Sequence, residues 1–109
     1  MTASRILLVV LVAAAAVACD QFSAEGRRRR TLHRLNETGT VIRRSCGLGE
    51  IHVDAARWGG MKPADQESAA AALASYCVEQ GGESTLTVLD ANSHTAIARW
   101  TGSALERTR

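Results

Sequence analysis

The sequence predicts an α+β domain in which one helix packs on a sheet of three or four strands, mainly antiparallel. Three observations support this prediction: apolar and polar residues alternate over residues 50–56, helical periodicity covers 63–80, and two strand-like runs, 85–90 and 95–101, flank a turn. A strand, helix, hairpin order is typical of folds in which a helix covers one face of a sheet. We place this domain at residues 41–102.

The strand expected at residues 50–56 has the two-residue period of a half-buried strand. Ile51 and the following apolar residues would face the helix, and His52 and Asp54 would face the other way. An irregular edge strand is expected just before it, at residues 40–43. The sheet would then have a fourth strand.

The helix is expected to begin near Pro63 because proline suits the first helical turn. Asp65 and Glu67 lie near its positive end, and the pair Gly81-Gly82 ends it. The side chains expected to face the sheet are mostly small: Ala69, Ala70, Leu73, Tyr76 and Cys77. Helix and sheet should therefore approach closely.

The last two strands are expected to form an antiparallel hairpin. Between residues 85–90 and 95–101 the sequence reads DANSH, and Asp, Asn and Ser side chains favour turns by bonding to nearby backbone. Residues 103–109 have mixed charge and are expected to be a flexible tail.

The composition favours a small, non-enzymatic protein without a cofactor. Hydrophobic residues make up 46% of the 109-residue chain but aromatic residues only 4%, so few large side chains are available for a core. So small a domain leaves little room for a catalytic pocket. The sequence also contains neither a glycine-rich phosphate loop nor a serine nucleophile elbow.

The first eighteen residues have the layout of a secretory signal peptide. Arg5 supplies positive charge, residues 6–18 form a run of thirteen residues without a polar side chain, and small residues precede Cys19. A helix of that length reaches roughly 20 Å, which is less than a hydrocarbon core of about 30 Å. A membrane-spanning helix is therefore disfavoured, and a reversed, uncleaved anchor ranks third among the interpretations.

The stretch AVAC at residues 16–19 resembles the lipobox of bacterial lipoprotein signal peptides, although Ala16 stands where that family usually has leucine. The resemblance implies cleavage before Cys19 and attachment of acyl chains, palmitate among them, to that cysteine. The same residues fit the Ala-x-Ala pattern of ordinary secretion, which would release a soluble periplasmic or secreted protein. Lipidation is the preferred interpretation.

The cysteine count fits this interpretation, because a chain with three cysteines leaves one unpaired. If Cys19 carries lipid, Cys46 and Cys77 remain as a pair, and a disulfide is their expected state in an oxidising compartment. Such a bond would stabilise so small a domain. Metal ligation and nucleophilic catalysis are the competing uses of these thiols, but the close ligand pairs typical of zinc sites are missing from the sequence.

Residues 19–40 are expected to form a basic tether between the anchor and the domain. A short helical segment over residues 29–36, with Leu32 and Leu35 on one side, is compatible with this tether. Arg27, Arg28, Arg29 and Arg30 follow one another there, while residues 45–98 hold two cations against seven acids. Such a run is either simply solvated or lies against anionic lipid headgroups. Nucleic-acid binding conflicts with export and with the acidic domain.

Four other residues are candidates for binding. Trp58, beside two glycines, either covers the core or forms a contact point for a partner. His52, Asp54 and His94 would form a weak alternative metal site if the hairpin turn brings them together. More often such residues lie on the solvated face of a sheet.

The stretch WGGMKPADQESAAAALASYC, followed by LTVLDANSHTAIA, resembles small exported bacterial proteins with no assigned activity. The resemblance supports the fold and implies no reaction. We therefore expect a lipoprotein of the bacterial cell envelope, held to a membrane by Cys19 and binding another, unknown envelope protein. The alternative is a soluble periplasmic or secreted module that binds a metal or small ligand.

Overall fold

A computed structural model of the chain describes residues 23–108. The expected signal peptide, residues 1–18, and the expected lipidation site, Cys19, lie outside the described residues. The chain divides into two units at Arg30 and Thr31, so the first turns of helix α2 and the domain that follows are described separately.

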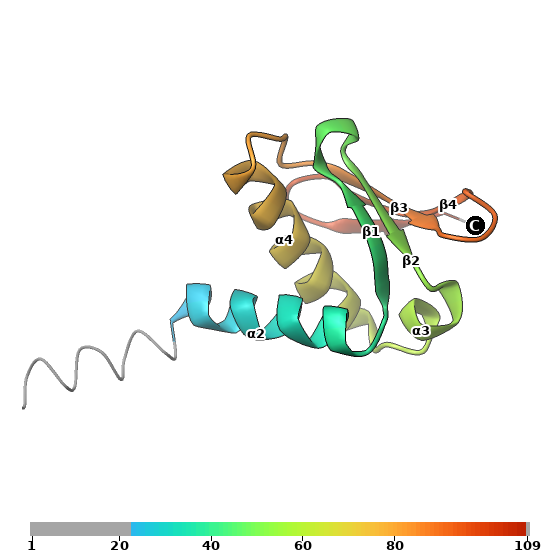
Figure 1. Ribbon diagram of the computed structural model, residues 1–109, viewed down its shortest axis with the longest axis horizontal. Coiled ribbons are helices and arrows are strands. Elements are labelled where there is room, and N and C mark those ends of the chain that lie inside the picture. The colour runs from blue at the N-terminus through green and yellow to red at the C-terminus, as the bar shows by residue number, and fades with distance from the viewer. Residues whose placement is uncertain (1–22, 109) are drawn as a thin grey trace, which may run out of the picture. The chain divides into compact units, whose positions relative to one another are not determined.

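Residues 23–108 contain three helices, one short 3₁₀ turn and a sheet of five strands, shown in Figure 1. In chain order the elements are α2 (Ala24–Glu37), β1 (Val41–Ser45), η1 (Cys46–Leu48), β2 (Glu50–Val53), α3 (Ala55–Gly59), α4 (Pro63–Glu79), β3 (Leu86–Asp90), β4 (Ala96–Trp100) and β5 (Leu105–Arg107).

The strands lie in the sheet in their order along the chain. Neighbours are antiparallel except β2 and β3, which pair in parallel with Ile51 opposite Val88. This parallel pair follows from the connection through α3 and α4, because a crossover returns the chain in its original direction. The α+β class is confirmed, whereas the expected sheet of three or four strands has five and is mixed.

The strand expected over residues 50–56 ends at Val53, and a helix that was not expected follows it. The Asp54 carboxylate accepts a hydrogen bond from the backbone N–H of Arg57 at 3.0 Å and so forms the N-cap of α3. Asp54 is therefore a helix-capping residue and not an outward-facing residue of the strand.

Within the tether expected at residues 19–40, α2 runs from Ala24 to Glu37 and is longer than the short helical segment considered at 29–36. Leu35 is buried, and Leu32, three residues earlier on the same side of the helix, packs against the same core. The domain therefore begins before residue 41.

The flexible tail expected at residues 103–109 is also wrong in part, because Leu105–Arg107 forms β5 against β4. Leu105 packs on the core, and the Arg107 side chain donates two hydrogen bonds to the Gln66 side-chain oxygen, at 3.1 and 3.0 Å. These contacts hold β5 to the sheet and to α4.

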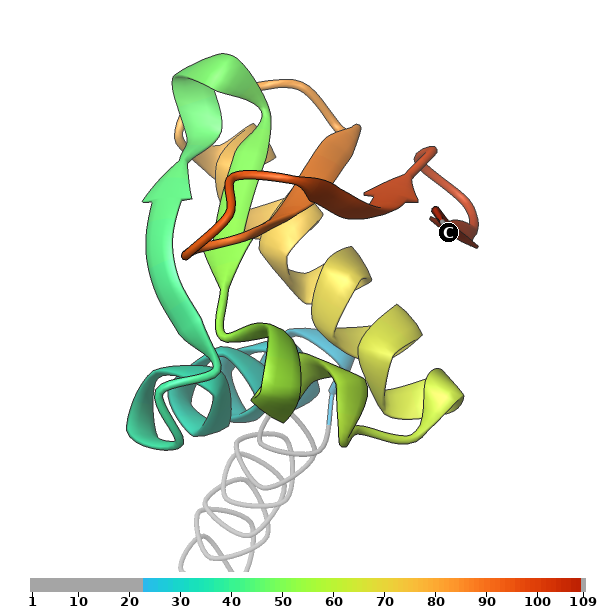
Figure 2. The same ribbon diagram turned by 90° about the vertical axis from the view of Figure 1, so that its right-hand side faces the viewer.

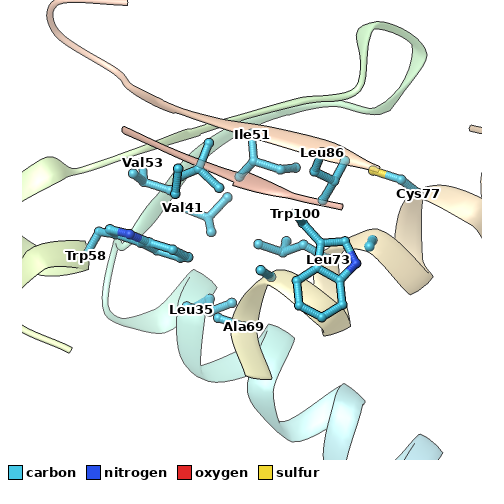
Figure 3. Packing of buried hydrophobic residues seen from close by; sticks show 14 residues of the cluster. Leu35, Val41, Ile51, Val53, Trp58, Ala69, Leu73, Cys77, Leu86 and Trp100 are labelled. Carbon is cyan, nitrogen blue, oxygen red and sulfur yellow. The ribbon is translucent and has the colours of Figure 1, made fainter. Parts of the chain in front are cut away.

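The core lies between α4 and the sheet, as Figure 3 shows. Its fully buried large side chains come from both layers: Ile51, Val53, Leu73, Leu86, Val88 and Cys77. On α4 the inward side is mostly alanine, as the sequence predicted, so helix and sheet approach closely. Trp58 and Trp100 supply much of the remaining bulk.

The predicted disulfide joins Cys46 and Cys77, whose Cα atoms are 5.0 Å apart and which are separated by 31 positions. It connects η1, the link between β1 and β2, to the last turn of α4. One end of the sheet is thus bonded covalently to the helix that covers it.

Gly82 lies directly against this junction. Its N–H donates to the Cys77 carbonyl oxygen at 2.7 Å, and a Cβ at Gly82 would lie 2.9 Å from the Cys46 carbonyl oxygen and 3.0 Å from that of Cys77. Both neighbours are backbone atoms held by the disulfide, so they cannot easily move aside. Glycine is required here for close approach.

We expect Gly82→Ala to lower the free energy of unfolding by about 1 to 3 kcal/mol, the usual cost of overpacking. Gly47→Ala is the matched control, because a Cβ at Gly47 would meet no atom within 4 Å. Urea denaturation of the two variants measures the difference. Equal stabilities would show that the junction is not tightly packed.

Candidate functional site

On the sheet face opposite α4, two of the predicted histidines lie together. His52 comes from β2, and His94 from the β3–β4 turn; their ring centroids are 6.0 Å apart in an edge-on arrangement. His52 is only 5% exposed, and Arg43, its partner on β1, donates a hydrogen bond from Nη2 to Nε2 of His52 at 3.1 Å. The nitrogen lone pair that a metal would need is therefore already engaged.

The metal site that His52, Asp54 and His94 offered as a weak alternative is not formed. Asp54 points its carboxylate to the N-terminus of α3 instead of joining the histidines. Within residues 23–108 no group of three or more His, Cys, Asp or Glu side chains is placed to hold a metal ion. Asp54 lies apart from the histidines because β2 ends at Val53, before Asp54.

The β3–β4 turn is organised by Asp90. Its carboxylate accepts from the backbone N–H of Asn92 at 2.9 Å, and its carbonyl oxygen accepts from the N–H of His94 at 2.8 Å, where His94 has a φ of 59°. The hydrogen bond from Asn92 is the main cause that holds the pKa of Asp90 below its ordinary value. Desolvation raises this pKa, whereas hydrogen bonds from Ser93 and the charge of His94 lower it further.

Trp58, predicted either to cover the core or to contact a partner, is 4% exposed and belongs to the core. The contact prediction is therefore wrong. Its carbonyl oxygen accepts a hydrogen bond from the buried Gln66 side-chain N–H₂ at 2.7 Å, while the Gln66 oxygen accepts from Arg107. Sequence reasoning missed Gln66, although its spacing of four from Ala70 places it on the inward side of α4.

Large apolar side chains are exposed elsewhere in the described part of the chain. They are Ile42 on β1, Leu48 on η1 and Val78 in the last turn of α4. Ile42 lies at a register irregularity of the edge strand β1. Scattered singly, such residues are ordinary, so they do not by themselves identify an interface.

The arginines predicted to contact a membrane surface lie on α2. Arg27, Arg29 and Arg30 are exposed and Arg28 is half-buried; Arg29 also approaches Glu25 at 3.7 Å. Arg27 and Arg30, three residues apart, lie on the same side of the helix. None of the helices between residues 23 and 108 is both long and apolar enough to cross a bilayer.

Two open cavities lie at opposite parts of the fold. The disulfide-end cavity, of about 430 Å³, is lined by η1 and the α4–β3 connection, including Gly47, Gly81, Glu83 and Arg99. The helix-end cavity, of about 480 Å³, is formed by residues of α2, α3 and α4 and the segments beside them. Both are of the size of ordinary small-molecule sites.

No protein-family model, curated protein or solved structure matches this chain in the three comparisons made. Function must therefore be inferred from the residues themselves.

We expect the Asp90 turn to lose its carboxylate contribution to stability as pH falls. A lowered folded-state pKa means that this contribution is complete above the unfolded-state pKa and disappears as pH falls through the folded-state value. Asp90→Asn keeps an acceptor for the Asn92 N–H but removes the titration.

The urea midpoints of the protein and of Asp90→Asn, measured from pH 6 to pH 2, should therefore converge at the acidic end, where the Asp90 carboxyl becomes protonated. NMR of the Asp90 carboxyl carbon measures its pKa directly. A value at or above 3.8, the ordinary one, would contradict this interpretation.

Proposed function

We propose that this protein is a non-enzymatic lipoprotein of the bacterial cell envelope, anchored through Cys19, whose small domain binds another envelope component. The observation that carries the proposal is the bond between Cys46 and Cys77. The chain has three cysteines, so this bond leaves Cys19, the residue at the end of the lipobox-like stretch, as the remaining one.

The disulfide also favours an oxidising compartment for this domain. Structural disulfides form and persist in oxidising surroundings such as the periplasm, and they are rare in the cytosol. This supports export, which the first eighteen residues predict on independent grounds. A domain facing the periplasm or the exterior is consistent with both.

The arginines of α2 support a position close to the membrane. Arg27 lies eight residues after Cys19, and the exposed Arg27 and Arg30 share one side of the helix. Next to an anionic leaflet each such charge contributes about 1 kcal/mol. In this proposal the arginines contact lipid headgroups, and the domain that follows them binds the partner.

We expect Cys19→Ser to move the protein from the membrane fraction to the soluble periplasmic or secreted fraction and to abolish incorporation of labelled palmitate. The reason is that serine offers no thiol for lipidation. Cell fractionation followed by immunoblotting, with metabolic labelling in parallel, measures both effects.

The matched control is the double variant Cys46→Ser/Cys77→Ser, which loses two cysteines but retains Cys19. It should keep both the label and the membrane fraction. A Cys19→Ser protein that stays in the membrane would refute the lipid anchor, and an unlabelled but soluble parent protein would favour ordinary secretion.

A further inference from the structure

We propose that the helix-end cavity binds an anionic headgroup that carries an apolar chain. The cavity brings together two arginines, several hydroxyl groups and an apolar floor from three helices and their connections. This inference concerns the domain alone and does not depend on the lipid anchor at Cys19.

The cavity is assembled from segments distant in sequence. Its lining comes from the last turns of α2, the α2–β1 connection, α3 and the residues after it, and the first two turns of α4. Figure 2 shows these segments gathered at one end of the sheet. The lining residues are Thr31, Arg34, Leu35, Thr38, Thr40, Arg57, Gly60, Met61, Asp65 and Ser68.

The charge of this lining favours an anion. Arg34 and Arg57 are both exposed, and neither forms an ion pair with a carboxylate in residues 23–108. Among the residues that line the cavity, Asp65 is the one carboxylate. Guanidinium groups bind phosphate and carboxylate oxygens by paired, charge-assisted hydrogen bonds.

The guanidinium group of Arg57 lies against the backbone of Gly39. A Cβ at Gly39 would lie 3.1 Å from Nη1 of Arg57, so the guanidinium packs against a position without a side chain. Gly39 has a φ of 70°, which favours glycine there. The turn that starts β1 thereby leaves room for the arginine at the cavity.

The rest of the lining suits the remainder of an amphiphile. Thr38 and Thr40 also line the cavity, and their hydroxyl groups are held within the domain: Thr38 donates to the Arg34 carbonyl oxygen at 2.9 Å and is hydrogen-bonded to the Thr40 hydroxyl at 2.8 Å. Leu35, which belongs to the core, and Met61, which packs against the core, supply the apolar surface of the cavity. A site with an apolar wall and a few polar groups is typical for small ligands.

The disulfide-end cavity does not offer the same chemistry. Its arginine, Arg99, is accompanied by Glu83, and it lies beside the C-terminus of α4, where the helix dipole is negative. Arg99 is exposed and lines the other cavity. Substituting Arg99 therefore removes one positive charge without changing the helix-end cavity and serves as a control.

The test uses the full-length Cys19→Ser chain, which lacks the site of lipidation. Isothermal titration calorimetry with dodecyl phosphate, kept below its critical micelle concentration, should show saturable binding at one site. Inorganic phosphate and the uncharged dodecyl maltoside should each bind far more weakly, because the first lacks the apolar chain and the second lacks the anionic group.

Arg34→Gln and Arg57→Gln should each weaken dodecyl phosphate binding about tenfold, as expected when one charge-assisted hydrogen bond is lost. Arg99→Gln, with the same change in charge, should leave the affinity unchanged. Ser68→Phe should block the cavity while keeping both arginines. Thermal unfolding of each variant shows that the fold is intact.

Competition by vesicles identifies the source of the headgroup. Phosphatidylglycerol vesicles that displace dodecyl phosphate, where phosphatidylcholine vesicles do not, would assign the site to a bilayer lipid; failure of both to compete would assign it to a soluble anionic amphiphile. The proposal is overturned if dodecyl phosphate does not bind, or if Arg99→Gln weakens binding as much as Arg34→Gln and Arg57→Gln. Neither result would affect the fractionation test of Cys19.

Discussion

The disulfide between Cys46 and Cys77 is the constraint on which the rest of this domain depends. The inward side of α4 is mostly alanine, and an alanine buries less apolar surface than a larger side chain does. By closing a loop of 31 positions, the bond limits the freedom of the unfolded chain and offsets this small core. The α4–β3 connection at Gly82 then fits closely against the joined segments.

The parts of the fold that the sequence predicts are those with a local periodic signal. The α4 helix, the β2 strand and the β3–β4 hairpin each carry such a pattern. Only a short segment of the α2 helix, residues 29–36, was considered from the sequence, because arginines dominate this stretch and the apolar signal comes from Leu32 and Leu35. The parallel pairing of β2 with β3 and the addition of β5 depend on contacts between distant segments, which no local pattern encodes.

The candidate sites also divide into those that a local sequence signal predicts and those that depend on contacts between distant segments. The disulfide pair was predicted from the cysteine count. The approach of His94 to His52 was considered only as part of a weak alternative metal site. Asp54 was misassigned because an N-cap and an outward strand position look alike in one sequence. The helix-end cavity was not predicted because Arg34 and Arg57 meet there only after three helices pack at one end of the sheet.

The central claim, that the Cys46–Cys77 bond holds the domain together, is tested most directly by urea unfolding of the oxidised and the reduced Cys19→Ser protein. The bond should contribute about 3 to 4 kcal/mol to the free energy of unfolding, as the loop-closure estimate for this separation gives. Reduction should therefore shift the midpoint to much lower urea or unfold the domain outright. An unchanged midpoint after reduction, with both thiols shown to be free, would contradict the account.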